Sequence, residues 1–381
     1  MTSTITIEIK SLKKALSVIS LAIGADTVRS HCLMVTNGKS LQLYATDNDK
    51  VAFSAAPVSL SDIPEGSQLS FTMDPKKTLS AIGMSDADSI TIIYDSDTKS
   101  TKIMLSDSGK NFLSFPSNDP ENFPSLKDTI SATEKVGSVD AAVMEKGIRF
   151  ISGFVSTETK ETVFSNIYIT SGCIFGSNGS SKIGGFTADT LEALKSVIIR
   201  HPIISPMQSF LDKVEDDEVL ILESETMLFL SDQALSNGFG FRKSTAKSPE
   251  FMLKFDKPEG FHIHVSKSSI IKSITRLLLT SESFIESNVA NEELTLQTLC
   301  DRPSMESIPC TPSDSSKAYK FYMESNLFKS VLGQFISPDL DIFEGDNRNI
   351  LFSTGTMVTG KNEDQRKFTE TALVSAPRIV L

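Results

Sequence analysis

The sequence predicts an α+β fold in which one supersecondary unit occurs three times. Helix starts follow short β-like runs at Ser11, Asp140 and Ser266, with spacings of 129 and 126 residues. A proline-containing segment closes the first two copies at Pro124 and Pro249, which are 125 residues apart. A repeat of this period indicates repeated domains, and 381 residues suffice for three of them. We therefore predict domains at 1–127, 136–254 and 260–381, joined by linkers at 127–135 and 254–260.

The first copy gives the order β-α-β-β-β-α-β-β-β. Apolar residues at helical spacing predict a helix over 11–22 with Ser11 as its N-cap. Asp74-Pro75 is typical of the start of a second helix, over 73–84, and Asn37-Gly38 of a hairpin turn. Alternating apolar and polar residues predict strands over 33–35, 40–45, 51–58, 69–73, 90–94, 102–105 and 112–115. Turns are predicted at 95–100 and 107–109.

The second copy repeats this order. Asp140 opens a helix over 140–152, and Ser205-Pro206 opens another over 205–214. Segment 190–201 has a helical pattern where the repeat requires a strand and a loop, and both interpretations stay open. The predicted strands are 163–170, 173–175, 219–222, 227–230 and 238–242.

The third copy has a helix over 266–281 and another over 324–335, the latter capped by Ser325. Its predicted strands are 294–299, 319–323, 340–343, 350–353 and 369–374.

Composition indicates a folded protein without disordered tracts, since 39% of residues are hydrophobic and 22% are charged. No signal peptide and no run of 18 apolar residues is present, so we expect a cytoplasmic protein without a membrane partner. The four cysteines lack metal-ligand spacing and are expected to be buried thiols.

Charge is unevenly distributed over the predicted elements. The six helices carry +6 in total, whereas the whole chain carries −11, so the remainder carries −17. This segregation suits a ring with sheets outside and helices lining a positive channel, where cations neutralise phosphates without reading bases. The alternative is that the lysine-bearing faces of these helices are ordinary solvent-exposed faces that do not bind DNA. The candidate DNA-binding residues are Lys10, Lys13, Lys14, Lys76, Lys77, Lys146, Arg149, Lys213, Lys267, Lys272 and Arg276.

No catalytic motif is found, so we expect neither an enzyme nor a cofactor. His262-x-His264 could place two imidazoles on one strand face, but no third metal ligand has suitable spacing, and a surface strand is favoured. Phosphate-binding loops, dinucleotide loops and nucleophile elbows are absent from the sequence. A structural or scaffold protein built from repeats, without DNA binding, remains an alternative.

The triplicated unit with lysine-bearing helices resembles the bacterial-type DNA polymerase sliding clamp (β clamp, a processivity factor). Local matches lie at 41–47 (Leu-Gln-Leu-Tyr-Ala-Thr-Asp), 123–126 (Phe-Pro-Ser-Leu) and the C-terminal 374–381. In the second copy the family's Ala-Thr-Asp turn is replaced by 176–183 with one insertion, and the tail lacks the family's methionines. Such divergence suits a phage-encoded clamp.

The resemblance implies a head-to-tail homodimer that encircles double-stranded DNA and tethers the replicative DNA polymerase. A clamp loader would open the ring, and the place of action would be the cytoplasm of a bacterial or phage-infected cell. The family's dimer contacts carry over to Phe112 on one side and to Leu278 and Leu279 on the other. The alternative for these three residues is the core of their own domain.

The resemblance also implies a pocket for short clamp-binding motifs of polymerases and other DNA enzymes. For Phe164, Ile183 and Val374 the alternative is again a place in the core. The positions that carry over are Phe164, Ser177, Gly179, Ile183, Pro249, Leu253, Val374, Ala376 and Pro377.

Overall fold

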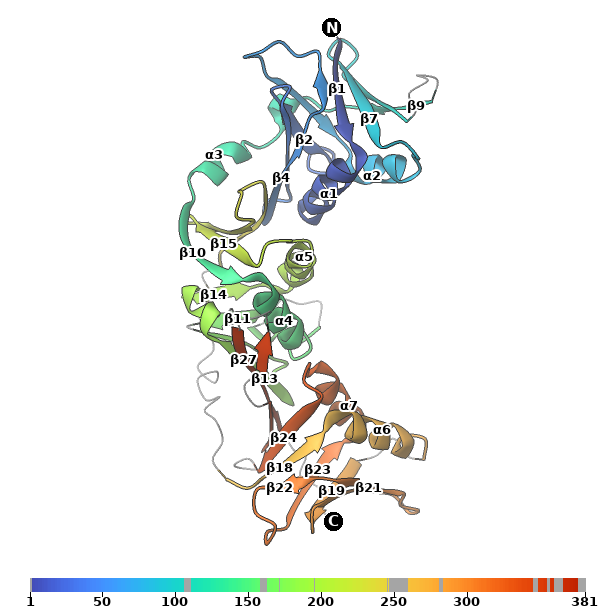
Figure 1. Ribbon diagram of the computed structural model, residues 1–381, viewed down its shortest axis with the longest axis vertical. Coiled ribbons are helices and arrows are strands. Elements are labelled where there is room, and N and C mark those ends of the chain that lie inside the picture. Colours follow the sequence, from blue (N-terminus) through green and yellow to red (C-terminus); the bar gives the residue numbers. More distant parts are fainter. Residues whose placement is uncertain are drawn as a thin grey trace. The chain divides into compact units, whose positions relative to one another are not determined.

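The predicted α+β class is confirmed in the computed structural model (Figure 1). It describes residues 2–105, 111–157, 163–170, 172–194, 196–244, 246, 260–280, 284–344, 349–354, 357–359 and 366–375. The chain forms two compact units, one of Met1–Ala141 with Ser205–Lys243 and one of Ala142–Ile204 with Ser244–Leu381. The middle copy of the repeat contributes to both units, and the division into three domains stays a prediction.

The first unit contains two antiparallel sheets. One has the order β5-β1-β7-β8-β9 and consists of β1 (Thr2–Glu8), β5 (Leu60–Ser61), β7 (Ser89–Asp95), β8 (Ser100–Met104) and β9 (Phe112–Pro116). The other has the order β10-β15-β16-β17-β4-β3-β2-β6. Its strands are β2 (Cys32–Thr36), β3 (Ser40–Thr46), β4 (Lys50–Pro57), β6 (Leu69–Met73), β10 (Glu134–Asp140), β15 (Glu218–Glu223), β16 (Met227–Ser231) and β17 (Asn237–Arg242).

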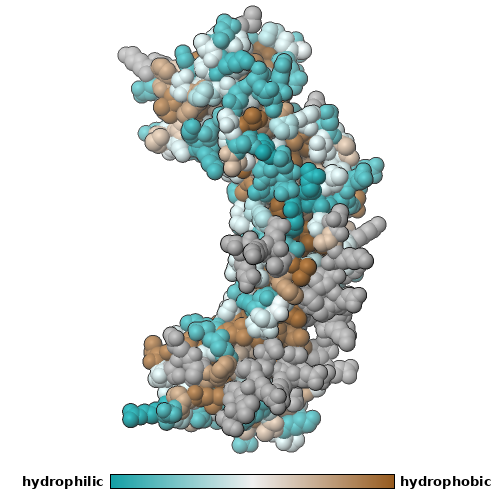
Figure 2. Space-filling view, turned by 180° about the vertical axis from the view of Figure 1, so that it is seen from behind, coloured by the Kyte–Doolittle hydropathy of each residue, from teal (hydrophilic) through white to brown (hydrophobic). Residues whose placement is uncertain are grey.

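Two helices of this unit, α1 (Ile9–Ile19) and α2 (Pro75–Gly83), pack side by side (Figure 1). The apolar stripe of α1 is fully buried at Leu12, Leu16 and Ile19 and faces β3 and β4. The remaining helical segments are η1 (Ser20–Ala22), η2 (Pro120–Asn122), α3 (Leu126–Ser131) and most of α5 (His201–Leu211). With the core covered in this way, apolar residues form only scattered patches on the face of this unit seen in Figure 2.

The second unit also contains two antiparallel sheets. The ten-stranded sheet has the order β14-β11-β12-β13-β27-β25-β24-β18-β22, with β26 paired to β27. Its strands are β11 (Ile167–Thr170), β12 (Cys173–Ser177), β13 (Lys182–Ala188), β14 (Ser196–Ile199), β18 (His262–Ser266), β22 (Thr311–Pro312), β24 (Asp339–Glu344), β25 (Asn349–Ser353), β26 (Met357–Thr359) and β27 (Arg366–Ser375). The other sheet is β21-β20-β19-β23, with β19 (Phe284–Ala290), β20 (Glu293–Thr298), β21 (Met305–Pro309) and β23 (Tyr319–Glu324).

The helices of the second unit are α4 (Ala141–Ser152), α6 (Lys267–Leu277) and α7 (Ser325–Gln334), with η3 (Val163–Ser165) and η4 (Asp189–Ala193). α6 and α7 pack side by side (Figure 1). A glycine lets α4 lie close to the sheet, because a Cβ on Gly147 of α4 would stand 2.7 Å from the Ile174 side chain of β12. No helix in the described part of the chain is long and apolar enough to cross a membrane.

Most predicted strands are confirmed, with ends shifted by a few residues at most. The Asn37-Gly38 turn joins β2 to β3, and Gly38 has the positive φ of +85° that this turn requires. Asp74 caps α2 as predicted, since its side chain accepts hydrogen bonds from the backbone N–H groups of Lys76 and Lys77.

Two predicted helix caps are wrong. Ser11 lies inside α1, whose N-cap is Glu8, and its hydroxyl donates to the Glu8 carboxylate at 2.7 Å. The helix starts earlier because Ile9 extends the buried stripe by one position. Ser325 is the buried first residue of α7, and the Glu324 carboxylate caps that helix by accepting from Asn326 and Leu327.

The weakest copy of the repeat differs most from its prediction. The helix predicted at Ser205-Pro206 begins at His201, with Pro206 inside it, because Ile203 and Ile204 are buried and belong to the same apolar stripe. Segment 190–201, for which both a helix and a strand with a loop were open, contains the end of η4 and then the strand β14. The strand that the repeat requires is therefore present. Residues 163–165 form the turn η3, so the strand predicted from 163 begins only at Ile167.

Other elements were not predicted at all. The linker over 127–135 is mostly α3 and the start of β10, whereas 254–259 and the turn at 107–109 lie outside the described residues. The missed strands are β5, β13, β19, β21, β22 and β26.

The predicted burial of the cysteine thiols is confirmed for Cys32 and Cys310 but is wrong for Cys300, which is exposed. Desolvation raises the pKa of Cys32 to about 12 and that of the half-buried Cys173 to about 11.

Candidate nucleic-acid interface

The lysines of α1 lie opposite its buried stripe. Lys10 and Lys14 are exposed and Lys13 is half-buried. Lys10 and Lys14 are four residues apart, so they share one side of the helix, with Lys13 beside them. This strip places three ammonium groups on the solvent side of the first unit.

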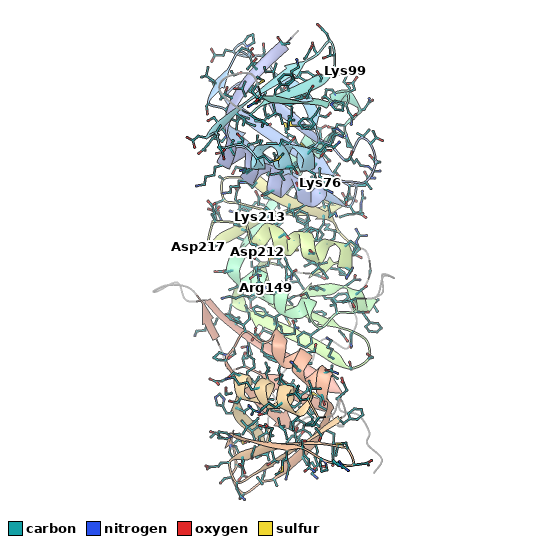
Figure 3. The ribbon with its side chains drawn as sticks, turned by 90° about the vertical axis from the view of Figure 1, so that its right-hand side faces the viewer. Lys76, Lys99, Arg149, Asp212, Lys213 and Asp217 are labelled. Atoms are coloured by element: carbon teal, nitrogen blue, oxygen red, sulfur yellow. The ribbon has the colours of Figure 1, made fainter. Side chains whose placement is uncertain are left out.

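The first turn of α2 adds two lysines to the first unit. Lys76 and Lys77 are both exposed, and Figure 3 labels Lys76. The ammonium of Lys77 lies 3.3 Å from the carboxylate of Asp74, the cap of the same helix. Lys76 makes no ion pair with another residue that the structure describes.

Acidic residues lie close to the lysines where α5 leads into β15. Figure 3 shows Lys213 beside Asp212 and Asp217 in this part of the first unit. Lys213 follows the end of α5, and its ammonium donates to the Ser209 carbonyl of that helix at 2.8 Å. Lys14 of α1 forms an ion pair with Glu215 at 2.9 Å, which lowers the pKa of that carboxyl.

In the second unit α6 carries three of the candidate cations. The Lys267 ammonium donates to the Phe335 carbonyl at 2.6 Å and is therefore engaged at the end of α7. The Arg276 guanidinium makes two hydrogen bonds to the Glu306 carboxylate, at 2.8 and 2.5 Å, which raise the pKa of Arg276 and lower that of Glu306. Lys272 is exposed and forms no ion pair within the described ranges.

The two candidates on α4 are also engaged. The Lys146 ammonium lies 5.4 Å from the centre of the Phe368 ring, and Arg149 forms an ion pair with Glu145 at 2.5 Å. A cation over an aromatic face is attracted by the ring quadrupole. Both side chains therefore have neighbours that compete with a phosphate.

The count of +6 over the helices therefore overstates the positive potential of the helix surfaces. Lys14, Lys77, Arg149 and Arg276 are each neutralised by a carboxylate. Among the described residues, the candidates whose ammonium group has neither an ion pair nor a hydrogen bond nor an aromatic contact are Lys10, Lys13, Lys76 and Lys272. The first unit holds three of these four.

The predicted peptide pocket is only partly described, because Pro249, Leu253, Ala376 and Pro377 lie outside the described residues. Gly179 lies against Phe164: its φ is +78°, and a Cβ there would stand 2.7 Å from the ring. The Ser177 hydroxyl accepts from the Gly179 N–H at 3.0 Å and donates to the Lys182 carbonyl at 3.1 Å. Phe164, Ser177 and Gly179 therefore lie together beside the β12–β13 turn.

The register of β13 and β27 separates two other pocket candidates. Ile183 is half-buried and lies opposite Leu373, whereas Val374 is fully buried and lies opposite Lys182. Since successive residues of a strand point to opposite faces, Ile183 and Val374 do not share a face. Leu373, which the sequence did not single out, is the residue of β27 beside Ile183. Leu373 could have been found from the alternation of residues along β27, but only if the pairing of β27 with β13 had been known.

Two of the three predicted dimer contacts are exposed apolar side chains. Phe112, on the edge strand β9, is 50% exposed, and Leu279, after the end of α6, is 84% exposed. Their exposure excludes the core alternative for both, while Leu278 is half-buried. Their role in a dimer stays a prediction.

The two histidines of the pair contact different residues. His264 Nδ1 lies 2.8 Å from the Asp341 carboxylate, and the His262 ring packs on Phe343 with 4.6 Å between ring centres. Within the described ranges, no group of three or more His, Cys, Asp or Glu side chains is arranged to hold a metal ion.

The fold is that of bacterial β sliding clamps. The DNA polymerase sliding clamp of Caulobacter crescentus superimposes with a TM-score of 0.76 at 14% identity, over 99% of this chain and all of that chain. The clamp of Bartonella birtlesii, solved bound to griselimycin, gives 0.77 at 15% identity over the full length of both chains. The DNA polymerase III β subunit of Thermotoga maritima gives 0.76 at 10% identity, over 99% and 100%. No known protein family and no curated protein matches the sequence.

Proposed function

We propose that this protein is a DNA sliding clamp that tethers a replicative DNA polymerase for processive synthesis. The observation that carries the proposal is the likeness to bacterial β clamps over the entire chain, at TM-scores of 0.76 and 0.77. Because sequence identity is only 10–15%, the likeness is one of fold. The lysines on α1, α2 and α6 add the chemistry that phosphate contacts require.

The mechanism we propose is topological and needs no catalysis by this chain. Three domains per subunit and two subunits, joined head to tail, would close a ring of six around the duplex, because a heterologous contact closes when its rotation closes. A polymerase bound to that ring stays at high effective concentration near its template. Lys10, Lys13, Lys76 and Lys272 would contact phosphates without sequence preference, which permits sliding.

The partners follow from this mechanism. A clamp loader would open the ring, and short motifs of the polymerase and other DNA enzymes would bind beside the β12–β13 turn, near Phe164 and Ile183. Such motifs bind through a few apolar anchors. The place of action would be the cytoplasm of a bacterial or phage-infected cell.

The test is retention on DNA of different topology. The full-length protein is incubated at high concentration with a circular plasmid, the complex is isolated by gel filtration, and the plasmid is then cut once. We expect the protein to stay on the circle and to leave the linear form. Equal retention on both forms would contradict the topological mechanism.

A further inference from the structure

We propose that Glu215 sets the DNA affinity of α1, because it holds Lys14 in an ion pair that a duplex phosphate must displace. The inference rests on the proposed function and assigns a role to the acidic turn between α5 and β15. It concerns only the first unit, which contains both partners. In this arrangement Lys10 and Lys13 can bind a phosphate directly. Lys14 can bind one only after the phosphate has replaced the Glu215 carboxylate.

The geometry singles out Glu215 among four consecutive acids at 215–218. Its carboxylate lies 2.9 Å from the Lys14 ammonium. Asp216 instead accepts a hydrogen bond from the Gln233 backbone, and Glu218 accepts one from the Ser138 hydroxyl. Glu215 is thus the acid of this turn that pairs with α1.

The electrostatics couple Glu215 to more than one lysine. The pKa of Glu215 is lowered, first by its hydrogen bond to Lys14 and then by the charges of Lys14 and Lys10. One carboxylate therefore reduces the positive potential at two of the three lysines on α1. A phosphate that approaches this helix has to compete with it.

The ion pair is placed so that exchange is possible. The Glu215 side chain is 79% exposed, so packing does not hold it, whereas that of Lys14 is 43% exposed. A cavity of about 70 Å³ lies beside the pair and is lined by Lys14, Val18, Phe210 and Glu215 among others. Glu215 can therefore swing away from Lys14 without breaking a packed contact.

The exchange has a signature in the salt dependence of binding. Each phosphate neutralised by a cation contributes about −0.9 to the slope of log K against log salt. When Lys14 already has a carboxylate partner, its contact with phosphate releases fewer counterions. The wild-type slope should therefore be shallower than that of a variant in which Lys14 is unpaired.

The experiment measures binding of a short fluorescent duplex to the full-length protein by anisotropy, over a series of salt concentrations. For Glu215→Gln we expect affinity to rise roughly two- to five-fold at low salt, as suits the strength of an exposed ion pair. The slope should steepen by up to about 0.9. The matched control is Glu65→Gln, which removes the same charge from an exposed pair with Lys39, 3.5 Å apart and outside the helices.

A double-mutant cycle completes the test. Lys14→Gln should weaken binding more in the Glu215→Gln background than in the wild type, because only there is Lys14 unpaired. If Glu215→Gln behaves like Glu65→Gln in both affinity and slope, the inference is overturned. An equal effect of Lys14→Gln in both backgrounds overturns it too. Neither outcome affects retention on circular DNA, which tests the proposed function separately.

Discussion

The carboxylate of Glu370, on β27, accepts hydrogen bonds from the backbone N–H of Ile336 at 3.1 and 3.0 Å. Ile336 lies in the segment that joins α7 to β24. A further bond comes from the N–H of Ser337 at 3.4 Å. The Glu370 side chain is fully buried, and desolvation raises its pKa to about 7 despite these bonds and the charges of Lys267 and Lys146. A buried acid thus links a helix-end segment to the ten-stranded sheet.

We predict that stability falls as the pH rises through the titration of Glu370. The folded protein binds this proton more tightly than the unfolded chain, whose pKa is the ordinary 4.5. The contribution is therefore complete below pH 4.5 and is lost between pH 4.5 and about 7. A shift of this size corresponds to at most about 3 kcal/mol of unfolding free energy.

Denaturant unfolding of the wild type and Glu370→Gln across this range checks the prediction. The difference in unfolding free energy between the two should change with pH, in favour of the variant at high pH. Glu286→Gln is the control, because Lys320 lowers the pKa of Glu286 and its contribution is lost only as the pH falls below 4.5. A pH-independent difference for Glu370→Gln would contradict the burial of a titrating acid.

The second prediction compares two cations one turn apart on α6. Lys272→Gln should weaken binding of duplex DNA and make the salt slope shallower by up to about 0.9, the value for one phosphate contact. Arg276→Gln should have a smaller effect, because Glu306 already holds that guanidinium. Anisotropy titrations at several salt concentrations measure both. A larger effect of Arg276→Gln would show that DNA displaces Glu306.

The pairing of Arg276 with Glu306 also shows where sequence analysis stops. The helical spacing that places Lys272 and Arg276 on one helix can be recognised in the sequence, because it depends on neighbouring residues. Glu306 is 30 residues further on, on a strand that the sequence did not predict, so the neutralisation of Arg276 could not be foreseen. Formal charge over helices is therefore an upper limit on their positive potential.

For strands and helix ends too, the sequence predicts what depends on neighbouring residues and misses what depends on distant contacts. The sequence predicts three copies because each predicted first helix has its own apolar stripe, as at Leu12 and Leu16, which are buried. β13 was missed because Gly184 and Gly185 give it no apolar alternation, and Gly184 is needed where Phe154 packs on the sheet. Helix ends were misplaced where a neighbouring carboxylate, such as Glu324, replaced the predicted serine cap.

The third prediction concerns Gly179, which combines a positive φ with a close approach to Phe164. Gly179→Ala should lower the unfolding free energy by more than the roughly 1 kcal/mol expected from the backbone conformation alone. Gly66→Ala is the control, because Gly66 has φ +83° but no atom within 4 Å of its Cβ position. Denaturant unfolding measures both. Equal losses would show that the Phe164 ring moves aside without cost.

The fourth prediction tests the exposed apolar side chains as subunit contacts. Leu279 is 84% exposed, so Leu279→Asp should leave the fold intact, yet it should convert the proposed dimer to a monomer because a carboxylate buried in an interface lacks a partner. Light scattering during gel filtration measures the mass, and circular dichroism checks the fold. Leu60→Asp is the control, since Leu60 is 72% exposed and lies outside the proposed contact. If both variants keep the wild-type dimer mass, Leu279 is not at the interface. If the wild type itself is a monomer of 41.5 kDa, two subunits do not form a ring in solution.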